Sequence, residues 1–309
     1  MSGGLTRCGF VAVLGAPNSG KSTLVNRAVG QKVSIVTQKV QTTRMAVRGI
    51  AITGDAQLVF VDTPGIFAPR RRLDRAMVKA AWGGAADADV VLLTVDAEEV
   101  ASQRHGLSGK DTDRIIEGLK GAGRRCVLVL NKIDAVKRDA LLPLVESLNE
   151  AGIFDRVFMI SALNGDGVDD LMAYCSAHVP EGPWLYPPDQ AADIPSRLLA
   201  AEITREKLYL RLHDELPYSS AVITDSWKEQ KDGSVRIDQT IFVERDGQKG
   251  IVVGKGGKTI KAIGESARHE LEQMFGRRVH LFLHTKVASG WGESRENYQE
   301  WGLEFPKDQ

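Results

Sequence analysis

A glycine-rich loop follows a short apolar run near the N-terminus, and its spacing restricts the folds that this chain can adopt. Residues 10–14 read FVAVL, residues 15–22 read GAPNSGKS, and a helix-like pattern continues through STLVNRAV. The loop meets the full spacing GxxxxGK[ST] between an expected strand and an expected helix. Its backbone N–H groups can close around a phosphate at the start of that helix. The sequence therefore predicts a phosphate-binding loop between a strand and a helix.

Runs rich in valine, leucine and isoleucine recur along the first 180 residues. They read LVFVD, VVLLTV, CVLVL and VFMIS, and longer helix-like segments separate most of them. Such runs are typical of parallel strands that helices cover on both faces. We predict an α/β fold with a doubly wound, mostly parallel sheet, whose ligands bind at the carboxyl ends of the strands.

The phosphate loop supplies the first candidate site residues. Lys21 can reach the β- and γ-phosphates of a nucleotide, and the Ser22 hydroxyl can ligate Mg²⁺. The residues that we expect at the phosphates are Gly15, Asn18, Ser19, Gly20, Lys21, Ser22 and Thr23.

A second motif ends the run LVFVD, where residues 62–65 read DTPG. The Asp62 carboxylate can hold the magnesium ion through water, and the Gly65 amide can meet the γ-phosphate. Hydrolysis would then release the segment that follows. Alone, DTPG is compatible with a simple turn, but its position one strand after a phosphate loop favours a nucleotide switch.

Two further motifs indicate the base. Residues 131–134 read NKID and residues 161–163 read SAL, each after an apolar run. The Asp134 carboxylate can accept both N–H groups on the Watson-Crick edge of guanine, a donor pair that adenine lacks. The expected guanine-binding residues are Asn131, Lys132, Asp134, Ser161, Ala162 and Leu163. The predicted ligands are GTP and GDP, and an ATPase or kinase remains an alternative only if Asp134 plays no part.

In this order the four motifs resemble those of the translation-factor-like GTPases. The resemblance implies a magnesium-binding threonine between the first two motifs, where residues 41–44 read QTTR. Thr43 is the preferred ligand and Thr42 the alternative, together with Ser22 and Asp62.

Two positions bear on the rate of hydrolysis. Ile66 stands where many relatives carry the glutamine that orients the attacking water. The isoleucine side chain can make no hydrogen bond, so we identify no side-chain base and expect slow intrinsic turnover. Another switch group, a partner or a monovalent cation would then aid hydrolysis. Asn18 matches the asparagine that potassium-dependent GTPases use to ligate K⁺. A simple brace for the loop is the other interpretation of Asn18, and both stay open.

A proline-rich segment divides the chain of 309 residues. Five of its eleven prolines lie in PEGPWLYPPDQAADIP, residues 180–195, which favours a linker. We predict a GTP-binding domain over 1–179 and a second domain over 196–309. The net charge is zero, the three cysteines form no CxxC pair, and no apolar run is long enough to span a bilayer. A cytoplasmic location is expected.

The second domain contains another glycine-rich run, IVVGKGGKTI, at residues 251–260. It fails the first motif's spacing because Val252 occupies the first glycine position, and it fails GxGxxG because Thr259 occupies the third. A GxxG loop at residues 254–257 remains, with a helix-like segment after it. The order around it is helix from Ser196, strands SSAVITDSW and VRIDQTIFVER, loop, helix, and strand VHLFLH. Whether residues 251–253 form a strand or a short helix stays open.

This order of elements resembles a type II KH domain, a smaller α+β RNA-binding fold. In KH domains the GxxG loop clamps about four single-stranded nucleotides. The corresponding residues here are Gly254, Lys255, Gly256, Gly257 and Lys258. Residues 245–286 contain nine Lys/Arg against four Asp/Glu, whereas the tail, 290–309, contains two against five. The basic segment agrees with an anionic partner.

Over nearly its whole length the chain resembles the Era family of bacterial GTPases. The resemblance rests on GAPNSGKST, QTTR, DTPGIF, NKID and SAL, and on ELPYS, VERDGQKGIVVGKGGKTIKAIG and KVASGW in the second half. It implies a ribosome-assembly GTPase that binds the 3′ end of 16S-type rRNA in the small ribosomal subunit, with a peripheral association at the inner face of the cell membrane. We expect a monomer. The alternative is a signalling or cell-cycle GTPase that uses the KH fold as a protein scaffold.

Overall fold

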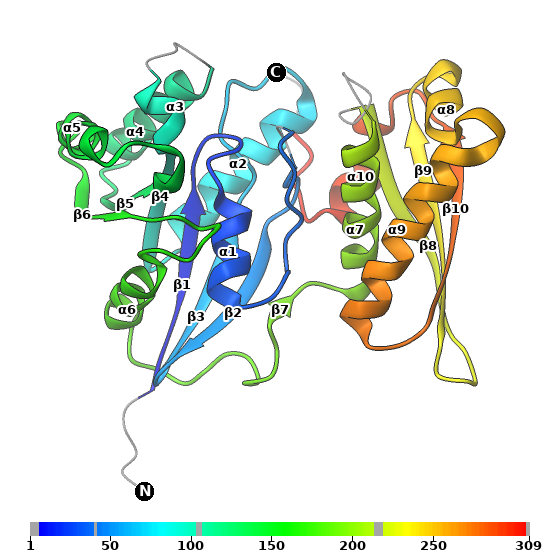
Figure 1. The fold of residues 1–309 in the computed structure, drawn as a ribbon, viewed down its shortest axis with the longest axis horizontal. Coiled ribbons are helices and arrows are strands. Elements are labelled where there is room, and N and C mark those ends of the chain that lie inside the picture. The colour runs from blue at the N-terminus through cyan, green and yellow to red at the C-terminus, as the bar shows by residue number, and fades with distance from the viewer. Residues whose placement is uncertain (1–5, 40–41, 103–106, 213–218, 307–309) are drawn as a thin grey trace, which may run out of the picture. The chain divides into compact units, whose positions relative to one another are not determined.

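The computed structural model of the chain describes residues 6–39, 42–102, 107–212 and 219–306 and divides into two compact units (Figure 1). The first unit comprises Met1–Asp193 and Tyr298–Gln309, and the second comprises Ile194–Asn297. Among the described residues, no helix is both long and apolar enough to cross a lipid bilayer. Gln41 of the QTTR motif lies outside the described residues.

The first unit is built on a seven-stranded sheet with the order β6-β5-β4-β1-β3-β2-β7. The strands are β1 (Arg7–Leu14), β2 (Val47–Thr53), β3 (Ala56–Asp62), β4 (Val90–Asp96), β5 (Cys126–Asn131), β6 (Phe154–Met159) and β7 (Ala192–Asp193). The pairs that join β6, β5, β4, β1 and β3 are parallel, whereas β2 runs antiparallel to both of its neighbours. The predicted α/β class with a mostly parallel sheet is confirmed.

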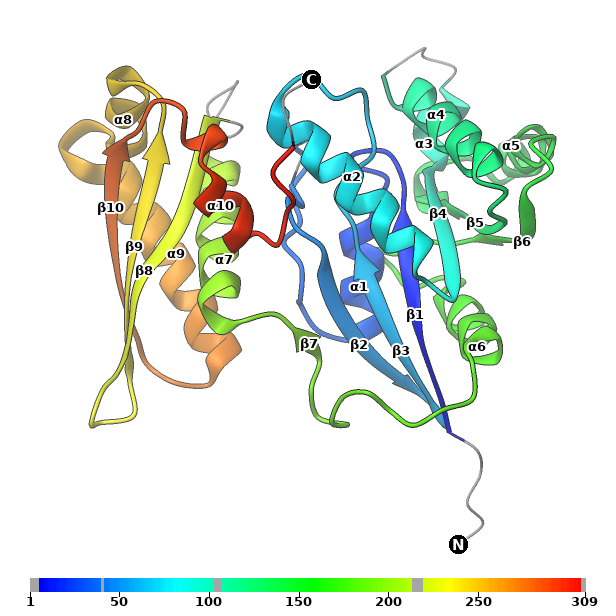
Figure 2. The ribbon, with the colours of Figure 1, turned by 180° about the vertical axis from the view of Figure 1, so that it is seen from behind.

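Helices cover both faces of this sheet. They are α1 (Lys21–Val29), α2 (Arg72–Ala86), α3 (Ala97–Ala101), α4 (Leu107–Gly121), α5 (Arg138–Asn149) and α6 (Val168–His178). Figure 1 shows α1 and α6 on one face, and Figure 2 shows α2 and α4 on the other. Val11 and Val13 of β1 pack beneath α1 and α6, whereas Ala12 and Leu14 pack toward α2, α4 and α5. Because both faces of a central strand are buried, the sequence shows an unbroken apolar run.

The proline-rich segment is bound to the first unit by hydrogen bonds and strand pairing. The side chain of Gln57, which is fully buried in β3, accepts hydrogen bonds from the amides of Leu185 and Tyr186 at 2.9 and 3.0 Å. Farther along, β7 pairs with Arg48 and Gly49 of β2. The boundary between the units therefore falls after Asp193, whereas the sequence places the end of the first domain at residue 179. Proline removes a backbone donor but does not prevent the neighbouring residues from docking.

The second unit contains a helix, two strands, two helices around a glycine loop, and a final strand. These are α7 (Ser196–Arg211), β8 (Ser220–Glu229), β9 (Val235–Val243), α8 (Asp246–Val253), α9 (Lys258–Phe275) and β10 (Val279–Val287). The sheet order is β10-β9-β8, with β9 antiparallel to β8 and parallel to β10. The predicted order of elements is confirmed, and residues 251–253 close the helix α8. The core joins apolar residues of α7, α8 and α9 to Val222, Ile241 and Val243 of the sheet.

The acidic C-terminal segment belongs to the first unit, although the sequence assigns it to the second domain. Tyr298, Trp301 and Leu303 are buried. The Phe305 ring packs edge-on against Tyr298 with centroids 4.9 Å apart, and the Arg72 guanidinium lies over Phe305 at 4.9 Å. Figure 2 shows this segment beside α2. Apolar side chains rather than the acidic charges determine where it packs, because their burial is favourable.

Candidate GTP and RNA sites

The phosphate loop leaves β1 and enters α1 at Lys21. Gly20 turns the chain with a φ of 93°, and a Cβ atom there would lie 2.1 Å from Asn131 Nδ2. Only glycine combines this backbone conformation with such a close approach. The loop therefore ends at the N-terminus of α1, where backbone amides favour an anion.

The Lys21 ammonium lies inside the loop. Its Nζ donates to the carbonyls of Gly15 and Ala16 at 3.2 and 2.8 Å, and the side chain is buried. Burial lowers the pKa of Lys21 to about 8, and the charge of Asp62 opposes this change. A phosphate bound in the loop would favour the charged ammonium. This position suits the predicted contact between Lys21 and the phosphates.

Three oxygens from three separate motifs meet beside the loop. Ser22 Oγ lies 2.7 Å from Asp62 Oδ2 and 3.0 Å from Thr43 Oγ1. The other carboxylate oxygen, Asp62 Oδ1, is buried without a hydrogen-bond donor at bonding distance among the described residues. Two hydroxyls and a carboxylate form an all-oxygen donor set that fits Mg²⁺. Thr42 points elsewhere, because its hydroxyl donates to the Lys39 carbonyl at 2.7 Å.

Burial raises the pKa of Asp62, and the Ser22 hydrogen bond and the Lys21 charge oppose the rise. A carboxylate in this setting is costly without a compensating cation. The observation agrees with a metal ion or its bound water beside Asp62.

The DTPG motif lies against the phosphate loop. A Cβ atom on Gly65 would lie 2.9 Å from Pro17 N, and the Ile66 amide donates to the Gly15 carbonyl at 3.1 Å. The Ile66 side chain is fully buried in the core that includes Ala12 and Leu14. It therefore points into the protein rather than toward the nucleotide.

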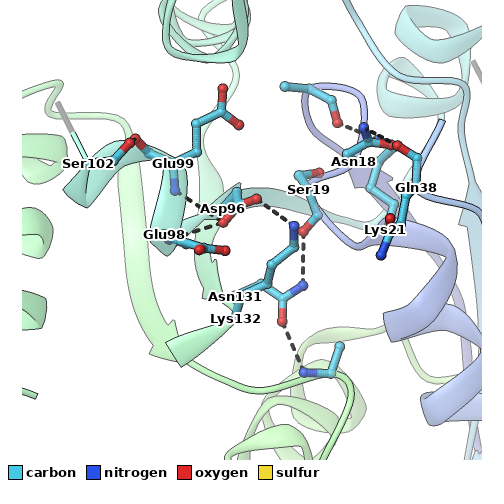
Figure 3. Close-up of polar contacts among 12 residues, drawn as sticks. Asn18, Ser19, Lys21, Gln38, Asp96, Glu98, Glu99, Ser102, Asn131 and Lys132 are labelled. Atoms are coloured by element: carbon cyan, nitrogen blue, oxygen red, sulfur yellow. Dashed lines mark hydrogen bonds and ion pairs between the residues drawn. The ribbon is translucent and has the colours of Figure 1, made fainter. Parts of the chain in front are cut away.

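Asn131 ties three of the motifs together (Figure 3). Its Nδ2 donates to the Ser19 carbonyl at 2.9 Å, and its Oδ1 accepts from the Ala162 amide at 3.0 Å. Lys132, in a left-handed conformation with a φ of 64°, donates from Nζ to Asp96 Oδ2 at 2.5 Å. The NKID and SAL motifs and the phosphate loop therefore form one connected site.

The groups expected to contact guanine differ in their availability. Asp134 is exposed, and its carboxylate accepts no hydrogen bond from the part of the chain that the structure describes. Leu163 is 67% exposed, whereas Ser161 and Ala162 are buried and the Ala162 amide is already engaged by Asn131. The free carboxylate of Asp134 suits an incoming pair of base N–H groups.

Two supporting residues were missed by the motif analysis. Asp96 is the last residue of β4. Its carboxylate accepts a hydrogen bond from the Lys132 ammonium and another from the Glu98 amide, which caps α3. Arg27 of α1 donates from Nε to the Ala162 carbonyl at 3.2 Å. A carboxylate at the carboxyl end of a strand could have indicated Asp96. The sequence around Arg27 offers no comparable signal.

Asn18 reaches the segment that precedes QTTR. The residue is exposed with a φ of 63°, and its Nδ2 donates to the Gln38 carbonyl at 3.0 Å (Figure 3). The bond links the phosphate loop to the segment that precedes the QTTR motif.

The GxxG loop joins α8 to α9 and depends on its glycines. Gly254, Gly256 and Gly257 have φ values of 72°, 60° and 76°, and a Cβ atom on Gly254 would lie 2.1 Å from Thr259 Oγ1. Lys255 and Lys258 are exposed at either side of the turn. The loop therefore presents two cations and the N-terminus of α9 to an anionic ligand.

A groove of about 420 Å³ lies between α9 and β10. Its lining residues are Ile260, Lys261, Gly264, Glu265, Arg268, Leu281, Phe282 and Leu283. A Cβ atom on Gly264 would lie 3.3 Å from Leu283 Cδ1, so glycine allows α9 to approach β10 closely. The sequence motifs indicate the loop but not these groove residues, because their contact depends on the packing of the helix on the strand.

Two protein families match the chain. The family described as 50S ribosome-binding GTPase matches residues 10–132, and the family described as KH domain matches residues 215–292. GTPase Era of Caulobacter vibrioides (strain NA1000 / CB15N) is 59% identical over 307 residues, covering 97% of each chain. GTPase Era of Sinorhizobium medicae (strain WSM419) is 60% identical over 302 residues, covering 98% of this chain and 95% of that protein.

Solved structures of Era proteins are similar to this chain in both sequence and fold. An Aquifex aeolicus Era variant bound to GDP.AlF4⁻ is 38% identical, with a TM-score of 0.88 over 96% of this chain and 99% of that one. Era in complex with MgGDPNP and nucleotides 1506–1542 of 16S ribosomal RNA is 37% identical, with a TM-score of 0.89 over the same shares.

Proposed function

We propose that this chain, which belongs to the Era family of GTPases, is a GTP-controlled RNA-binding factor for assembly of the small ribosomal subunit. It hydrolyses GTP in its first unit. Through the loop Gly254–Gly257 in its second unit, it binds the single-stranded 3′ end of small-subunit rRNA. The observation that carries the RNA binding is the GxxG loop with its exposed Lys255 and Lys258 at the start of α9, the helix that also lines the α9–β10 groove.

The choice of RNA is supported by a relative. Era of 37% identity is in complex with MgGDPNP and nucleotides 1506–1542 of 16S ribosomal RNA. A GxxG loop recognises backbone phosphates of single-stranded RNA, because the missing side chains let the phosphates approach backbone amides. The two lysines add contacts that weaken with salt.

In the first unit, Lys21 binds the phosphates and Asp134 binds guanine. Ser22, Thr43 and Asp62 would hold Mg²⁺, with Thr42 as the alternative to Thr43. The hydrogen bond between Ser22 and Thr43 supports Thr43. When bound, the ion supplies positive charge that stabilises developing charge on the phosphate oxygens.

The nucleotide state controls the protein through the two switch segments. GTP orders the segments around QTTR and DTPG, and hydrolysis relaxes them and releases the protein from the ribosomal subunit. Ile66 contributes no group to the attacking water, so intrinsic turnover is slow and depends on a partner, another switch group or a monovalent cation.

Asn18 supports potassium as that cation, since its side chain lies between the phosphate loop and the first switch segment. Single-turnover hydrolysis is expected to be faster in potassium than in sodium at equal ionic strength. The control is Asn18→Ala measured in both salts, which should lose the difference. Equal rates in the two salts would leave Asn18 as a brace alone.

The proposed RNA binding is tested with the double variant Lys255→Asp/Gly256→Asp of the full chain. Both positions are exposed, and a Cβ atom on Gly256 would meet no atom within 4 Å. Gly256 also has a φ of 60°, so the matched control is Lys120→Asp/Gly123→Asp at the end of α4, where Gly123 is exposed with a φ of 61° and open space around it. It changes the charge and the backbone strain equally. We expect the loop variant to lose binding to an oligonucleotide from the 3′ end of small-subunit rRNA while GTP hydrolysis persists in both variants.

Unchanged RNA affinity in the loop variant would refute the RNA role and favour the signalling alternative, in which the KH fold acts as a protein scaffold. Crosslinking and sequencing of the bound RNA, with GTP or GDP present, would identify the target in cells.

Two further expectations belong to this function. A monomer is expected, and light scattering on the purified full chain measures it. The family resemblance implies a peripheral membrane contact, which co-sedimentation with vesicles of anionic phospholipid measures.

A further inference from the structure

An exposed aromatic ring stands on the edge strand of the second unit. Phe282 is 44% exposed in β10, which lies at one edge of the three-stranded sheet (Figure 1). Side chains alternate between the two faces of a strand, so Phe282 shares its face with His280, His284 and Lys286. Such a ring contributes little to the core, whose β10 members are Leu283 and Val287.

The Phe282 ring is paired with a fixed guanidinium. Arg236 of β9 lies over the ring, with Cζ 4.4 Å from the centroid. Asp238 holds Arg236 through two hydrogen bonds, from Nε at 3.1 Å and from Nη2 at 2.9 Å. Because the Asp238 carboxylate binds one edge of the guanidinium, the plane of the guanidinium is oriented before any ligand binds.

Phe282 forms a wall of two separate hollows. One is the α9–β10 groove described above. The other, about 540 Å³, lies between β10 and the turn that joins β8 to β9. Its lining residues are Gln230, Lys231, Asp232, Ser234, Arg236, His280 and Phe282. Because Phe282 belongs to both linings, it lies between the groove proposed for RNA and a second polar hollow.

The second hollow offers a cation to an anionic chain. Lys231 and Arg236 line it, and because Asp238 pairs with Arg236, Lys231 is the cation that we assign to a phosphate; Asp232 is the carboxylate among the lining residues. Asp232 already accepts hydrogen bonds from the amide and hydroxyl of Ser234 at 3.0 and 2.6 Å. The hollow thus combines a cation for a phosphate, polar edges and a flat stacking surface, the groups that single-stranded RNA requires.

We propose that Phe282 and Arg236 form a stacking platform for a base of the RNA strand that leaves the α9–β10 groove and enters the second hollow. Lys231 contacts the phosphate beside that base. The platform rests on the proposed function, since it extends the RNA path that begins at the GxxG loop. It lengthens the bound segment beyond the roughly four nucleotides that a KH groove holds.

The test compares short and extended RNA on the full-length protein. The short oligonucleotide has four nucleotides from the 3′ end of small-subunit rRNA, and two longer ones add three nucleotides at the 5′ or the 3′ side. Phe282→Leu removes the ring and keeps apolar bulk, and Arg236→Lys keeps the charge without the plane. Phe282→Trp keeps a stacking surface and adds a fluorescent reporter, with circular dichroism as the folding check.

We expect Phe282→Leu to weaken binding of one longer oligonucleotide by about 5- to 100-fold, the loss associated with one stacked base. Binding of the short oligonucleotide should stay within about twofold of wild type, since the platform lies beyond the four-nucleotide groove. Arg236→Lys should reduce the affinity for the same longer oligonucleotide. The Phe282→Trp fluorescence should be quenched by that oligonucleotide and not by the short one.

Equal losses for short and long RNA, or no loss for either, would overturn the platform. A Phe282→Leu variant that keeps full RNA affinity but loses a protein partner would assign the surface to protein docking and also overturn it. Wild-type protein that binds none of the oligonucleotides would refute the proposed RNA function, and the platform with it. Loss of all RNA binding in Lys255→Asp/Gly256→Asp would support the proposed function independently of Phe282.

Discussion

At position 66 the side chain and the backbone have separate roles. The Ile66 amide binds the Gly15 carbonyl of the phosphate loop, whereas the side chain is fully buried in the apolar core. The backbone therefore keeps the DTPG motif beside the phosphate loop while the side chain stabilises the fold. A polar side chain at this position would enter the core before it could reach a water molecule at the γ-phosphate.

We predict that Ile66→Gln destabilises the protein without accelerating hydrolysis. Burying an amide in apolar surroundings should lower the free energy of unfolding by about 1–3 kcal/mol. Urea unfolding and single-turnover GTP hydrolysis measure the two effects. The control Ile66→Val should lower the free energy of unfolding by only about 0.5–1.5 kcal/mol. Faster hydrolysis by Ile66→Gln at unchanged stability would contradict this account.

Asp134 carries the prediction for base selectivity. Asp134→Asn replaces a double acceptor with a group that also donates, so it should weaken GTP binding about 10- to 100-fold, the loss expected for a hydrogen bond to a charged group. The same variant should gain affinity for xanthosine nucleotides, which present an acceptor where guanosine presents a donor. Equilibrium titration with GTP and XTP measures this exchange. Asp139→Asn, an exposed change in α5, is the matched control and should bind like wild type. Retained GTP selectivity in Asp134→Asn would remove Asp134 from the proposed site.

The sequence groups residues best where several of them share a motif. Ser22 and Asp62 come from two motifs and Thr43 from the family resemblance, and the fold brings their oxygens together. Arg27 and Asp96 support the same site singly, and a single residue has no spacing from which to infer a role. Phe282 also escaped prediction, because its significance depends on exposure at a sheet edge.

At the scale of elements, β2 and α8 show where local pattern is insufficient. The β2 residues fall between two motifs, and their pairing with β3 in the antiparallel direction follows from the turn at Thr53–Ala56, which periodicity does not reveal. In α8, the β-branched IVV favours a strand by propensity. Val252 is instead fully buried in the helical side of the core, and Gln248 accepts from the Arg245 amide at the start of α8. Tertiary packing and capping outweigh the propensity of three residues.

A buried ion pair within α7 leads to an element-scale prediction. Arg205 is 2% exposed, donates to Glu202 Oε1 at 2.8 Å and stacks over Tyr209. Arg205→Met should lower the free energy of unfolding by about 3–5 kcal/mol, because Glu202 is left buried without its partner. Arg205→Met/Glu202→Met should recover much of that loss, since both charges are gone.

Urea unfolding followed by circular dichroism measures this cycle. Arg211→Met, at an exposed position of the same helix, is the control and should leave stability nearly unchanged. Equal losses in the single and double variants would show that the guanidinium contributes through packing rather than through the charge of Glu202.

At the scale of the whole molecule, the second unit is inserted between two parts of the first. The chain leaves the first unit after Asp193 and returns to it at Tyr298. The sequence did not predict this return because the prediction rested on the acidic charge of the tail, whereas Tyr298, Trp301 and Phe305 belong to no motif. Burial of Tyr298 and Trp301 fixes it nevertheless. The C-terminal segment packs on α2, which is the next helix in the chain after the DTPG motif.

The last prediction concerns this return. Trp301 is 7% exposed, so Trp301→Ala should remove about 3–5 kcal/mol of packing from the first unit, the range for a large buried aromatic. Because a two-unit protein need not unfold in one step, hydrogen exchange is the better readout. The amides of α2 should lose protection, whereas those of α7 and α9 should not, and the RNA affinity should be retained. Glu304→Gln removes an exposed ion pair with Lys79 beside the same helix and should have little effect, since exposed pairs contribute little. Unchanged protection of α2 in Trp301→Ala would show that the C-terminal segment lies on the first unit without stabilising it.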